Sequence, residues 1–357
     1  MDKTTVDRII AGRETLALTD GDAPVAVPAR PQVWAAGNFA VRAGSSGRTG
    51  YRSVVTQAKN AISVGSVDAL EPLRLSVFSS LGPTMDGRIK PDLVAPGCQD
   101  SSVEPWEGIR AASGAHQGYA RDCGTSMSAP VVSAVVALMR EIADTDLRPA
   151  TYKAILVATA QDLIQTAAVP GAPMNPDTGA PTTFGTGPDF ATGFGLIDVR
   201  AALDLAAHQG RWREEMLREQ TLERCFAIEP HTNGEPFRVA LAWDDPPAPL
   251  SDASIARLVN DLDLRLIGPD DSVYLPWVLP APPPGPDDGT GLTPHTAWPT
   301  PEAAPGVDSV NTVELVEVAQ PVPGRWRAVV STGHLADGPE QTFSVAANVT
   351  LDPDCPL

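Results

Sequence analysis

The sequence has no long apolar run. No stretch of its 357 residues approaches the roughly 20 uninterrupted apolar residues that a membrane-spanning helix needs. The longest candidate, Ala129 to Met139, has the length of a core helix. The amino terminus, MDKTTVDRII, has no basic segment followed by an apolar one, so it predicts no secretory signal in this chain. We therefore expect no membrane partner.

Basic residues are also scarce. The chain has 26 Lys and Arg against 44 Asp and Glu, which gives a formal net charge of −18. A protein that binds nucleic acid needs clustered Lys and Arg to neutralise phosphates, so this composition excludes that class of partner. The acidic balance favours solubility instead.

Short apolar segments alternate with helical patterns up to about residue 210. Buried strands are predicted in PQVWAAGN (31–38), NAISVGSV (60–67) and PDLVAPG (91–97), and helices in TYKAILVATAQDL (151–163), in DVRAALDLAAH (198–208) and after Ser126. This alternation is typical of an α/β domain with a mainly parallel sheet and flanking helices. With 43% hydrophobic residues the chain is long enough for two domains, and we place the first at residues 1–210.

From residue 211 onward the pattern has a period of two. Four groups of apolar residues each share one strand face: Phe237, Val239, Leu241 and Trp243; Leu262, Leu264 and Leu266; Trp326, Ala328 and Val330; Phe343, Val345 and Ala347. Strands with one dry and one wet face predict an all-β sandwich or jelly roll at residues 211–357. Residues 280–305 are too rich in Pro and Gly for either element, and we interpret them as a long surface loop of this domain.

The segment CGTSMSAPVVSAVVALM, residues 123–139, places Ser126 before a helix that is apolar on every side. A helix amino terminus offers unpaired N–H groups and a partial positive charge, which stabilise an oxygen that becomes negative. Pro130 is expected in the first turn, where its missing N–H costs little, and Gly124 permits a tight turn and a close approach by substrate. The position suits a nucleophile, and the alternative is that Ser126 is a simple N-cap.

Three ordered segments resemble the subtilisin-like serine peptidases, or subtilases. Gly124-Thr125-Ser126-Met127-Ser128-Ala129-Pro130 is similar to the nucleophile motif of that family. AAGN, Ala35 to Asn38, resembles its oxyanion-hole motif, and SSLGPTMDGRIKPDLVAPG, Ser79 to Gly97, resembles the segment under its substrate cleft. GFGLIDVRAAL, from Gly193, resembles the closing turn and helix of the catalytic domain.

The second domain carries a finer resemblance. FRVALAWDD, LVNDLDLRLIGPD, NTVELVEV, GRWRAVV and QTFSV are similar to the C-terminal β-barrel domain of a group of bacterial alkaline subtilases. Generic sandwiches share the same alternation, so these segments are less specific than the serine motif.

The resemblance implies roles for individual residues. Ser126 would attack the scissile carbonyl, while the Asn38 side-chain amide and the Ser126 backbone N–H would hold the oxyanion. Trp34, Ala35, Ala36 and Gly37 would form one wall of the substrate pocket, with Gly124 and Thr125 facing it. Core packing is the alternative for Trp34, and a turn after a strand is the alternative for Asn38.

The Asp and His of the family's triad have no counterpart at the expected places. Subtilases supply them before the serine, yet the histidines stand at 116, 208, 231, 295 and 334, and none precedes Asn38. Asp177-Thr178-Gly179 looks like the Asp motif but follows the serine in a Pro- and Gly-rich stretch, which predicts a turn. His231 precedes a strand, and His116 falls in a predicted hairpin between Gln99 and Asp122, so neither is expected to act as the base.

The four cysteines predict two disulfides. The resemblance implies that Cys98, after VAPG, and Cys123, before GTSM, face each other. Cys225 lies on the first strand of the β domain and Cys355 just past the last, and the ends of a sandwich often adjoin. Free thiols are the alternative, because a metal site is disfavoured by the lack of any Cys-x-x-Cys pair. Disulfides indicate an extracellular location for the full-length protein.

The resemblance implies one possible cofactor, and the sequence leaves two candidate functions. No cofactor is required for the chemistry, but subtilases often bind structural calcium, and Asn260, Asp261 and Asp263 offer oxygen atoms without forming an assigned ligand set. We expect a subtilisin-type endopeptidase chain that is inactive alone and needs an N-terminal segment carrying Asp and His. We also expect the isolated chain to be poorly soluble or partly molten. The alternative is a non-catalytic peptide- or glycan-binding protein on the same scaffold.

Overall fold

A computed structural model describes most of the chain outside its first residues. The described residues are 18–20, 22–25, 30–40, 53–70, 73–102, 105–114, 118–143, 145–163, 185–229, 236–248, 258–280 and 302–355. The MDKTTVDRII segment, His116, Asp177 to Gly179, His231, His295 and residues 281–301 of the predicted loop lie outside them.

The first half of the chain forms a mixed sheet. Its strands are β3 (Val33–Ala35), β4 (Ile62–Asp68), β5 (Arg74–Leu75) and β6 (Leu93–Cys98). β4 pairs in parallel with β3 and with β6, while β5 pairs with it in antiparallel fashion. The three strands predicted at residues 31–38, 60–67 and 91–97 are therefore present, and β4 is buried along its whole length.

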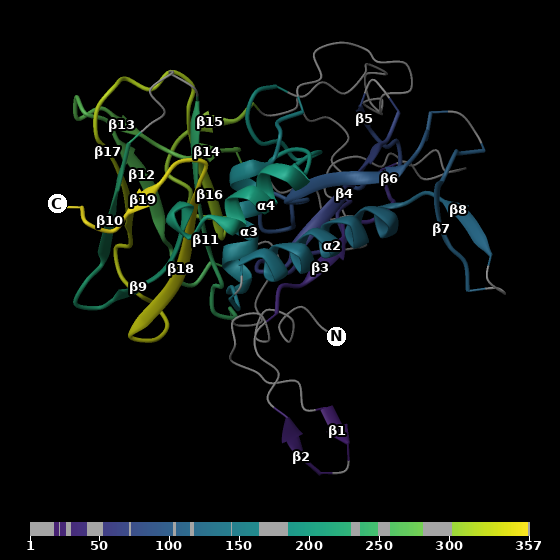
Figure 1. The fold of residues 1–357 in the computed structure, drawn as a ribbon, viewed down its shortest axis with the longest axis horizontal. Helices are drawn as coiled ribbons and strands as arrows, with labels where there is room; N and C mark the ends of the chain where they lie inside the picture. The colour runs from purple at the N-terminus through teal and green to yellow at the C-terminus, as the bar shows by residue number, and fades with distance from the viewer. Residues whose placement is uncertain are drawn as a thin grey trace.

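The described residues form three helices in the middle of the molecule (Figure 1). They are α2 (Thr125–Ala143), α3 (Pro149–Thr159) and α4 (Val199–Ala207), the last followed by the 3-10 turn η1 (Gln209–Arg211). The Asp198 side chain caps α4 by accepting a hydrogen bond from the Ala201 N–H at 2.9 Å. α3 ends before the predicted position at residue 163, because Gln161 and Leu196 exchange backbone hydrogen bonds of 2.7 and 2.8 Å.

The placement of α2 corrects two predictions. The helix begins at Thr125, so Ser126 lies inside its first turn and Pro130 lies beyond that turn. Pro130 has no N–H to donate to the Ser126 carbonyl four residues earlier, which makes it a local interruption of the helix ladder. The helix is also less buried than its composition predicts. Only one face packs on β3, β4, β6 and α4, and Leu138 and Ile142 are exposed.

α2 is long and apolar enough to cross a membrane by length and composition alone. A single helix of this kind is weak evidence for a membrane span, and one face of α2 packs on the sheet.

Two hairpins extend from the first half. β1 (Leu18–Asp20) pairs with β2 (Asp22–Val25), and β7 (Ile109–Ala112) pairs with β8 (Tyr119–Asp122), both in antiparallel fashion. The second hairpin confirms the one predicted between Gln99 and Asp122. Figure 1 shows it projecting from the end of the molecule opposite the C-terminus.

The second half contains two larger antiparallel sheets. One has the strand order β13-β12-β17-β10-β19 and the other β16-β11-β18-β9. Their bounds are β9 Trp212–Arg218, β10 Glu223–Ile228, β11 Phe237–Trp243, β12 Asp263–Ile267, β13 Val273–Tyr274, β16 Val313–Val318, β17 Trp326–Ser331, β18 Glu340–Ala347 and β19 Leu351–Asp352. A further pair, β14 (Trp277–Val278) and β15 (Ala304–Pro305), flanks the predicted loop, so its last two residues are a short strand.

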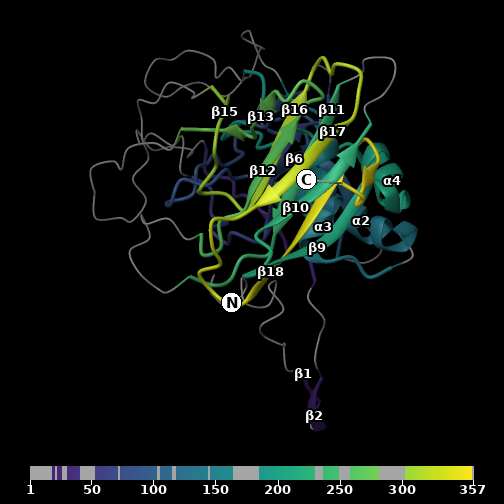
Figure 2. The ribbon, with the colours of Figure 1, turned by 90° about the vertical axis from the view of Figure 1, so that its left-hand side faces the viewer.

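The four predicted apolar faces meet between these two sheets in one core. It includes Trp243, Leu264, Trp326 and Phe343, each no more than 1% exposed. Figure 2 shows the strands of the two sheets from the side of the C-terminus. The period-two pattern thus identified the residues that fill the sandwich.

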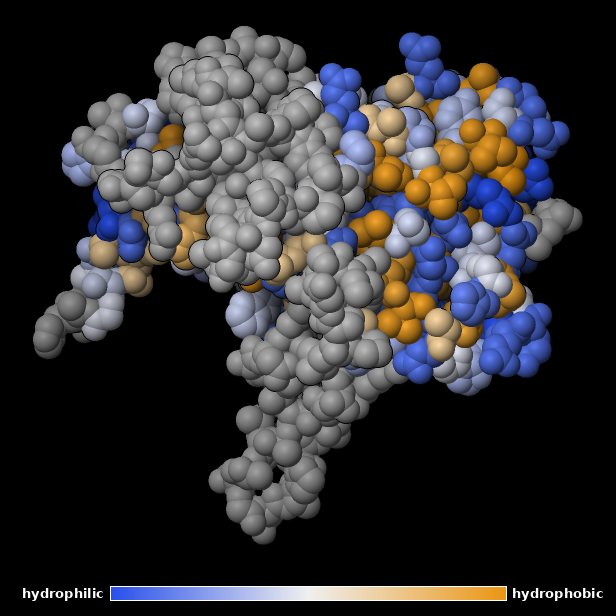
Figure 3. All heavy atoms as spheres, turned by 180° about the vertical axis from the view of Figure 1, so that it is seen from behind, coloured by the Kyte–Doolittle hydropathy of each residue, from blue (hydrophilic) through white to orange (hydrophobic). Residues whose placement is uncertain are grey.

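The sequence predicted a solvent-exposed outer face on each sheet, and this prediction is wrong for the sheet that contains β11 and β18. Ala240, Ala242 and Ala346 on its outer face are fully buried and share a core with Ile155 of α3. The small side chains let α3 pack directly on the sheet, so a single hydrophobic core runs from the first half of the chain into the second. On the rear face, Figure 3 shows hydrophobic residues interspersed with hydrophilic ones over the half that carries the antiparallel strands.

Candidate functional site

Asn38 is presented by a tight turn at the end of β3. Gly37 has a φ of +114°, which an L side chain rarely adopts, and a Cβ there would lie 2.8 Å from Ser80 Oγ. The Gly37 carbonyl accepts a hydrogen bond from the Ser80 N–H at 2.9 Å, and Ser80 Oγ accepts one from the Phe39 N–H at 3.0 Å. Asn38 is exposed between these fixed residues.

Ser126 is exposed in the first turn of α2. The turn before it is tied to the end of β6 by a hydrogen bond of 3.0 Å from the Gly124 N–H to the Gly97 carbonyl. The Cys98–Cys123 disulfide links the two neighbouring residues, as predicted. The position of the serine is therefore fixed by the sheet as well as by its own helix.

Thr125 joins the two predicted functional residues. Its backbone N–H and its hydroxyl both donate to Asn38 Oδ1 at 2.9 Å, and its Oγ1 accepts a hydrogen bond from the Gly37 N–H at 3.1 Å. Thr125 is 1% exposed, so water does not compete for these bonds. Because the carbonyl oxygen of Asn38 is held toward Thr125, the amide nitrogen is turned the other way.

The two expected oxyanion donors border one small space above Gly124. A Cβ added to Gly124 would lie 3.0 Å from Asn38 Nδ2 and 3.7 Å from the Ser126 backbone nitrogen. Met127 Sδ lies 3.6 Å from the same point, and glycine keeps a methyl group out of it. Donors preorganised around one point are what stabilisation of a developing oxyanion requires.

The residues predicted to contact substrate lie in two places and differ in exposure. Trp34 to Gly37 lie at and just after the end of β3, whereas Gly124 and Thr125 lie at the start of α2 and are both buried. Trp34 is 42% exposed, which disfavours the core-packing alternative, whereas Ala35 is half-buried and Ala36 is fully buried. Two further apolar side chains lie next to Gly37 and are exposed, Phe39 at 48% and Val55 at 55%. Sequence analysis did not single out either one, although Phe39 directly follows the AAGN segment.

The described residues contain two histidines. His208, at the end of α4, has its Nδ1 2.6 Å from the Asp204 carbonyl, and the His334 carbonyl accepts a hydrogen bond from Thr332 Oγ1 at 2.9 Å. Within the described ranges, neither forms a hydrogen bond with Ser126. The other three histidines and Asp177 lie outside those ranges.

A group of carboxylates occupies the entrance of β12. Asp261 Oδ1 is buried without a hydrogen-bond partner among the described residues. Burial, reinforced by the charges of Asp263 and Asp308, raises the pKa of Asp261 to about 6. Burial also raises the pKa of Asp263 and, more strongly, that of Glu314.

The described residues do not assign ligands to the expected calcium ion. In the part of the chain that the structure describes, no three His, Cys, Asp or Glu side chains come together as metal ligands. The calcium expectation therefore stays a prediction without ligands.

The second predicted disulfide is also present. Cys225 on β10 is bonded to Cys355, which follows β19. Since β19 pairs with β10, the two ends of the sandwich adjoin as predicted.

Comparison with known proteins gives one family match. The model of the subtilase family matches residues 7–195. Among curated proteins, the chain is 28% identical over 246 residues to the serine protease/ABC transporter B family protein tagD of Dictyostelium discoideum, covering 53% of this chain and 13% of that protein. It is 46% identical over 81 residues to a C5a peptidase of Streptococcus pyogenes, covering 21% of this chain and 6% of that one.

The chain thus spans a small part of the length of these curated relatives. Among solved structures, it is similar to a protease from Pseudoalteromonas arctica with a TM-score of 0.37 and 19% identity, covering 58% of this chain and 59% of that one. The patellamide maturation protease PatA gives a TM-score of 0.32 and 20% identity, covering 49% and 50%.

Proposed function

The chain belongs to the subtilase family, and from that premise we propose that it carries the nucleophile and oxyanion half of a subtilisin-type endopeptidase site. Ser126 is the nucleophile. Asn38 Nδ2 and the Ser126 backbone N–H are the oxyanion donors. The observation that carries this proposal is the space above Gly124, which both donors border.

The chemistry follows from these positions. Ser126 Oγ attacks the scissile carbonyl as a base removes its proton, and the carbonyl oxygen becomes negative between the two donors. As the C–N bond breaks, the leaving amine takes from the base the proton that came from Ser126 Oγ, and water then hydrolyses the acyl-enzyme formed at Ser126. Thr125 holds Asn38 throughout, so the donor needs no rearrangement as charge develops.

The proton must be taken by a group that the described residues do not place beside Ser126. We propose that an N-terminal segment supplies the Asp and His of the triad and that the chain without it is inactive. A site that has the serine but lacks its base still accelerates hydrolysis about 10³- to 10⁴-fold over the uncatalysed reaction in water, through substrate binding and oxyanion stabilisation alone. The two disulfides support an extracellular location, and a peptide or protein is the expected substrate.

A fluorophosphonate probe tests the proposal, because it labels only activated serines. The chain is compared alone and fused behind a subtilase segment that carries the Asp and His motifs. We expect little labelling of the chain alone and strong labelling of Ser126 in the fusion, lost on Ser126→Ala. A fusion that is folded by circular dichroism, has both disulfides and leaves Ser126 unlabelled would favour the non-catalytic binding protein.

A further inference from the structure

Residues 53–60 cover the turn that presents Asn38. The Val55 N–H donates to the Ala36 carbonyl at 2.8 Å, and Thr56 Oγ1 donates to the Ala35 carbonyl at 2.9 Å. A Cβ at Gly37 would lie 3.2 Å from Val55 Cγ1. This segment therefore braces the backbone on the amino-terminal side of Asn38.

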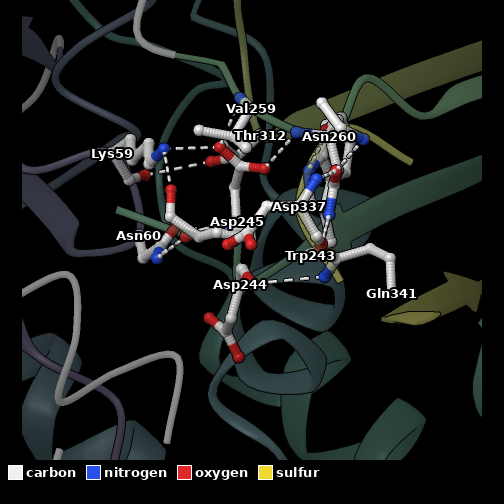
Figure 4. Close-up of polar contacts among 12 residues, drawn as sticks. Lys59, Asn60, Trp243, Asp244, Asp245, Val259, Asn260, Thr312, Asp337 and Gln341 are labelled. Carbon is white, nitrogen blue, oxygen red and sulfur yellow. Dashed lines mark hydrogen bonds and ion pairs between the residues drawn. The ribbon is translucent and has the colours of Figure 1, made fainter. Parts of the chain in front are cut away.

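The far end of the same segment is held by the antiparallel half of the chain, through Asp245 (Figure 4). Lys59 Nζ donates to Asp245 Oδ2 at 2.5 Å, and the two side chains are 1% and 0% exposed. Asn60 Nδ2 donates to the Asp245 carbonyl at 2.9 Å, and the Asp245 N–H donates back to Asn60 Oδ1 at 3.1 Å. Lys59 and Asn60 are thus bound to one residue by three hydrogen bonds.

Asp245 is itself fixed within the antiparallel half. Its Oδ1 accepts a hydrogen bond from the Asn260 N–H at 2.7 Å, and its Oδ2 accepts one from the Val259 N–H at 2.9 Å. The Asn260 side chain donates to Gln341 Oε1 at 2.9 Å, which extends the network to β18. Figure 4 shows Asp245 between Lys59 on one side and Asn260 on the other. Asp245 therefore acts as an anchor for Lys59.

Loss of this anchor has a direct physical consequence. Lys59 Nζ also donates to the Pro246 carbonyl, but a buried ammonium group without a carboxylate is strongly unfavourable, so we expect the Lys59 side chain to shift toward water. The Lys59 carbonyl still accepts hydrogen bonds from Lys153 Nζ and Thr312 Oγ1, both at 3.0 Å, so the segment loosens without leaving its place. Only three residues separate Thr56, which holds Ala35, from Asn60.

We infer that Asp245 is a positioning residue for the oxyanion donor: by anchoring Lys59 and Asn60, it holds residues 53–60 against β3 and so fixes the turn at Asn38. The antiparallel half then contributes to the geometry of the site without touching substrate. The inference rests on the proposed function only in calling Asn38 the oxyanion donor.

Hydrogen–deuterium exchange of the full chain tests this inference without requiring activity. In Asp245→Asn we expect the amides of residues 33–40 and 53–60 to exchange at least about tenfold faster, while those of β17 keep their rate. Glu214→Gln is the matched control. Glu214 also joins the two halves, by accepting from the Arg148 N–H at 2.7 Å and from Thr151 Oγ1 at 2.5 Å, but it contacts the start of α3. The Glu214→Gln substitution should leave the exchange rates of residues 33–40 unchanged.

A second pair of variants keeps the test decisive. Asn60→Ala removes two hydrogen bonds to Asp245 without leaving a buried charge, and should give the same pattern more weakly even where Asp245→Asn fails to fold. Lys59→Met combined with Asp245→Asn removes both charges and should restore protection of residues 33–40.

Three results would overturn the inference. They are unchanged exchange at residues 33–40 in folded Asp245→Asn or Asn60→Ala, the same acceleration in Glu214→Gln, and no restoration in the double variant. The proposed function fails on a different readout, since exchange does not depend on the reactivity of Ser126.

Discussion

Thr125 holds Asn38 by donating two hydrogen bonds, from its backbone N–H and its hydroxyl, to the same side-chain oxygen at 2.9 Å. Thr125, which directly precedes Ser126, thereby sets the direction of the Asn38 side-chain amide. The two residues are 87 positions apart in sequence, yet the serine motif and the AAGN segment form one hydrogen-bonded unit, because the start of α2 lies against the end of β3.

Removal of the Thr125 hydroxyl should loosen Asn38. Thr125→Val keeps the shape of the side chain but removes one donor to Asn38 and the acceptor for the Gly37 N–H. We expect the rate of fluorophosphonate labelling in the fusion to fall about tenfold from loss of the hydrogen bond to Asn38, which is worth about 1–1.5 kcal/mol. Loss of the second bond, from the Gly37 N–H, should lower stability as well. Thr125→Ser retains the hydroxyl and should label at close to the original rate. Equal rates for the Val and Ser variants would show that the hydroxyl has no such role.

Filling the space above Gly124 should block the oxyanion donors. In Gly124→Ala the new methyl group would lie 3.0 Å from Asn38 Nδ2, where the substrate oxygen is expected. Labelling in the fusion should fall at least a hundredfold, since loss of a single oxyanion donor already costs about 10²–10³ in rate in subtilisin-type enzymes. A folded Gly124→Ala variant with unchanged labelling would place the oxyanion elsewhere.

Stability should rise as the pH falls from 7.5 to 5. Burial raises the pKa of Asp189 to about 6, although hydrogen bonds from Ala191 and Thr192 oppose it, and the pKa of Asp261 is also raised to about 6. These carboxyl groups take up protons near pH 6 in the folded chain and only near pH 4 in the unfolded chain, so acidification favours folding. Burial lowers the pKa of Lys90 to about 7, which opposes this effect only at the upper end of the window. The melting temperature, measured in EDTA, is expected to increase.

Asp261→Asn provides the control for this pH dependence. The substitution removes one of the two carboxyl groups whose pKa is raised to about 6. It should therefore increase the melting temperature at pH 7.5 and weaken the increase in melting temperature between pH 7.5 and 5. Repeating the melts with calcium chloride tests the calcium prediction. A calcium-dependent increase that Asp261→Asn abolishes would support a structural ion there, whereas a melting temperature that falls between pH 7.5 and 5 would contradict the assignment of raised pKa values.

Both disulfides should contribute to stability. The bridges close loops with sequence separations of 25 and 130, for which chain-entropy arguments give about 3–5 kcal/mol each. Thiol counting by mass spectrometry should find no free thiols before reduction and four after it. Cys225→Ser with Cys355→Ser should lower the free energy of unfolding more than Cys98→Ser with Cys123→Ser, because it opens the longer loop. Four free thiols in protein made in an oxidising compartment would rule out both bridges.

The exposed face of α2 should limit solubility of the chain alone. Leu138 is 48% and Ile142 is 42% exposed on the same helix. Contiguous apolar surface of this kind promotes association. Leu138→Gln with Ile142→Lys should reduce aggregation, measured by light scattering, and reduce binding of a hydrophobic dye. A sharp, cooperative melt of a monodisperse monomer of the unaltered chain would contradict the prediction that it is poorly soluble or partly molten.

Sequence patterns predicted which segments come together more accurately than the packing around them, while the roles of Ser126 and Asn38 stay a proposal. Ser126 and Asn38 stand in short, specific motifs, and the structure brings them together through Thr125. The role of Thr125 was not predicted, because a side chain that holds another across 87 residues leaves no periodic signal. The cysteine pairs were predictable because each flanks an element end that the fold places beside its partner.

The relation between the two halves could not be predicted from periodicity. Ala240 and Ala242 alternate with larger apolar residues on β11, so they fall where a wet face was expected. Their burial against α3 depends on a helix far away in sequence. Likewise, Lys59 and Asp245 are 186 residues apart, and neither lies in a motif that predicts a buried ion pair. Tertiary packing decided both outcomes.

The most direct measurement is the labelling rate of Ser126 in the fusion carrying Asp and His, compared between the original sequence and Asn38→Ala. Our account predicts a site-specific adduct on Ser126 that forms about 10²–10³ times more slowly once the amide is gone, which is the range established for loss of the corresponding asparagine in subtilisin itself. A rate that does not change with Asn38→Ala, or an adduct on another serine, would contradict it.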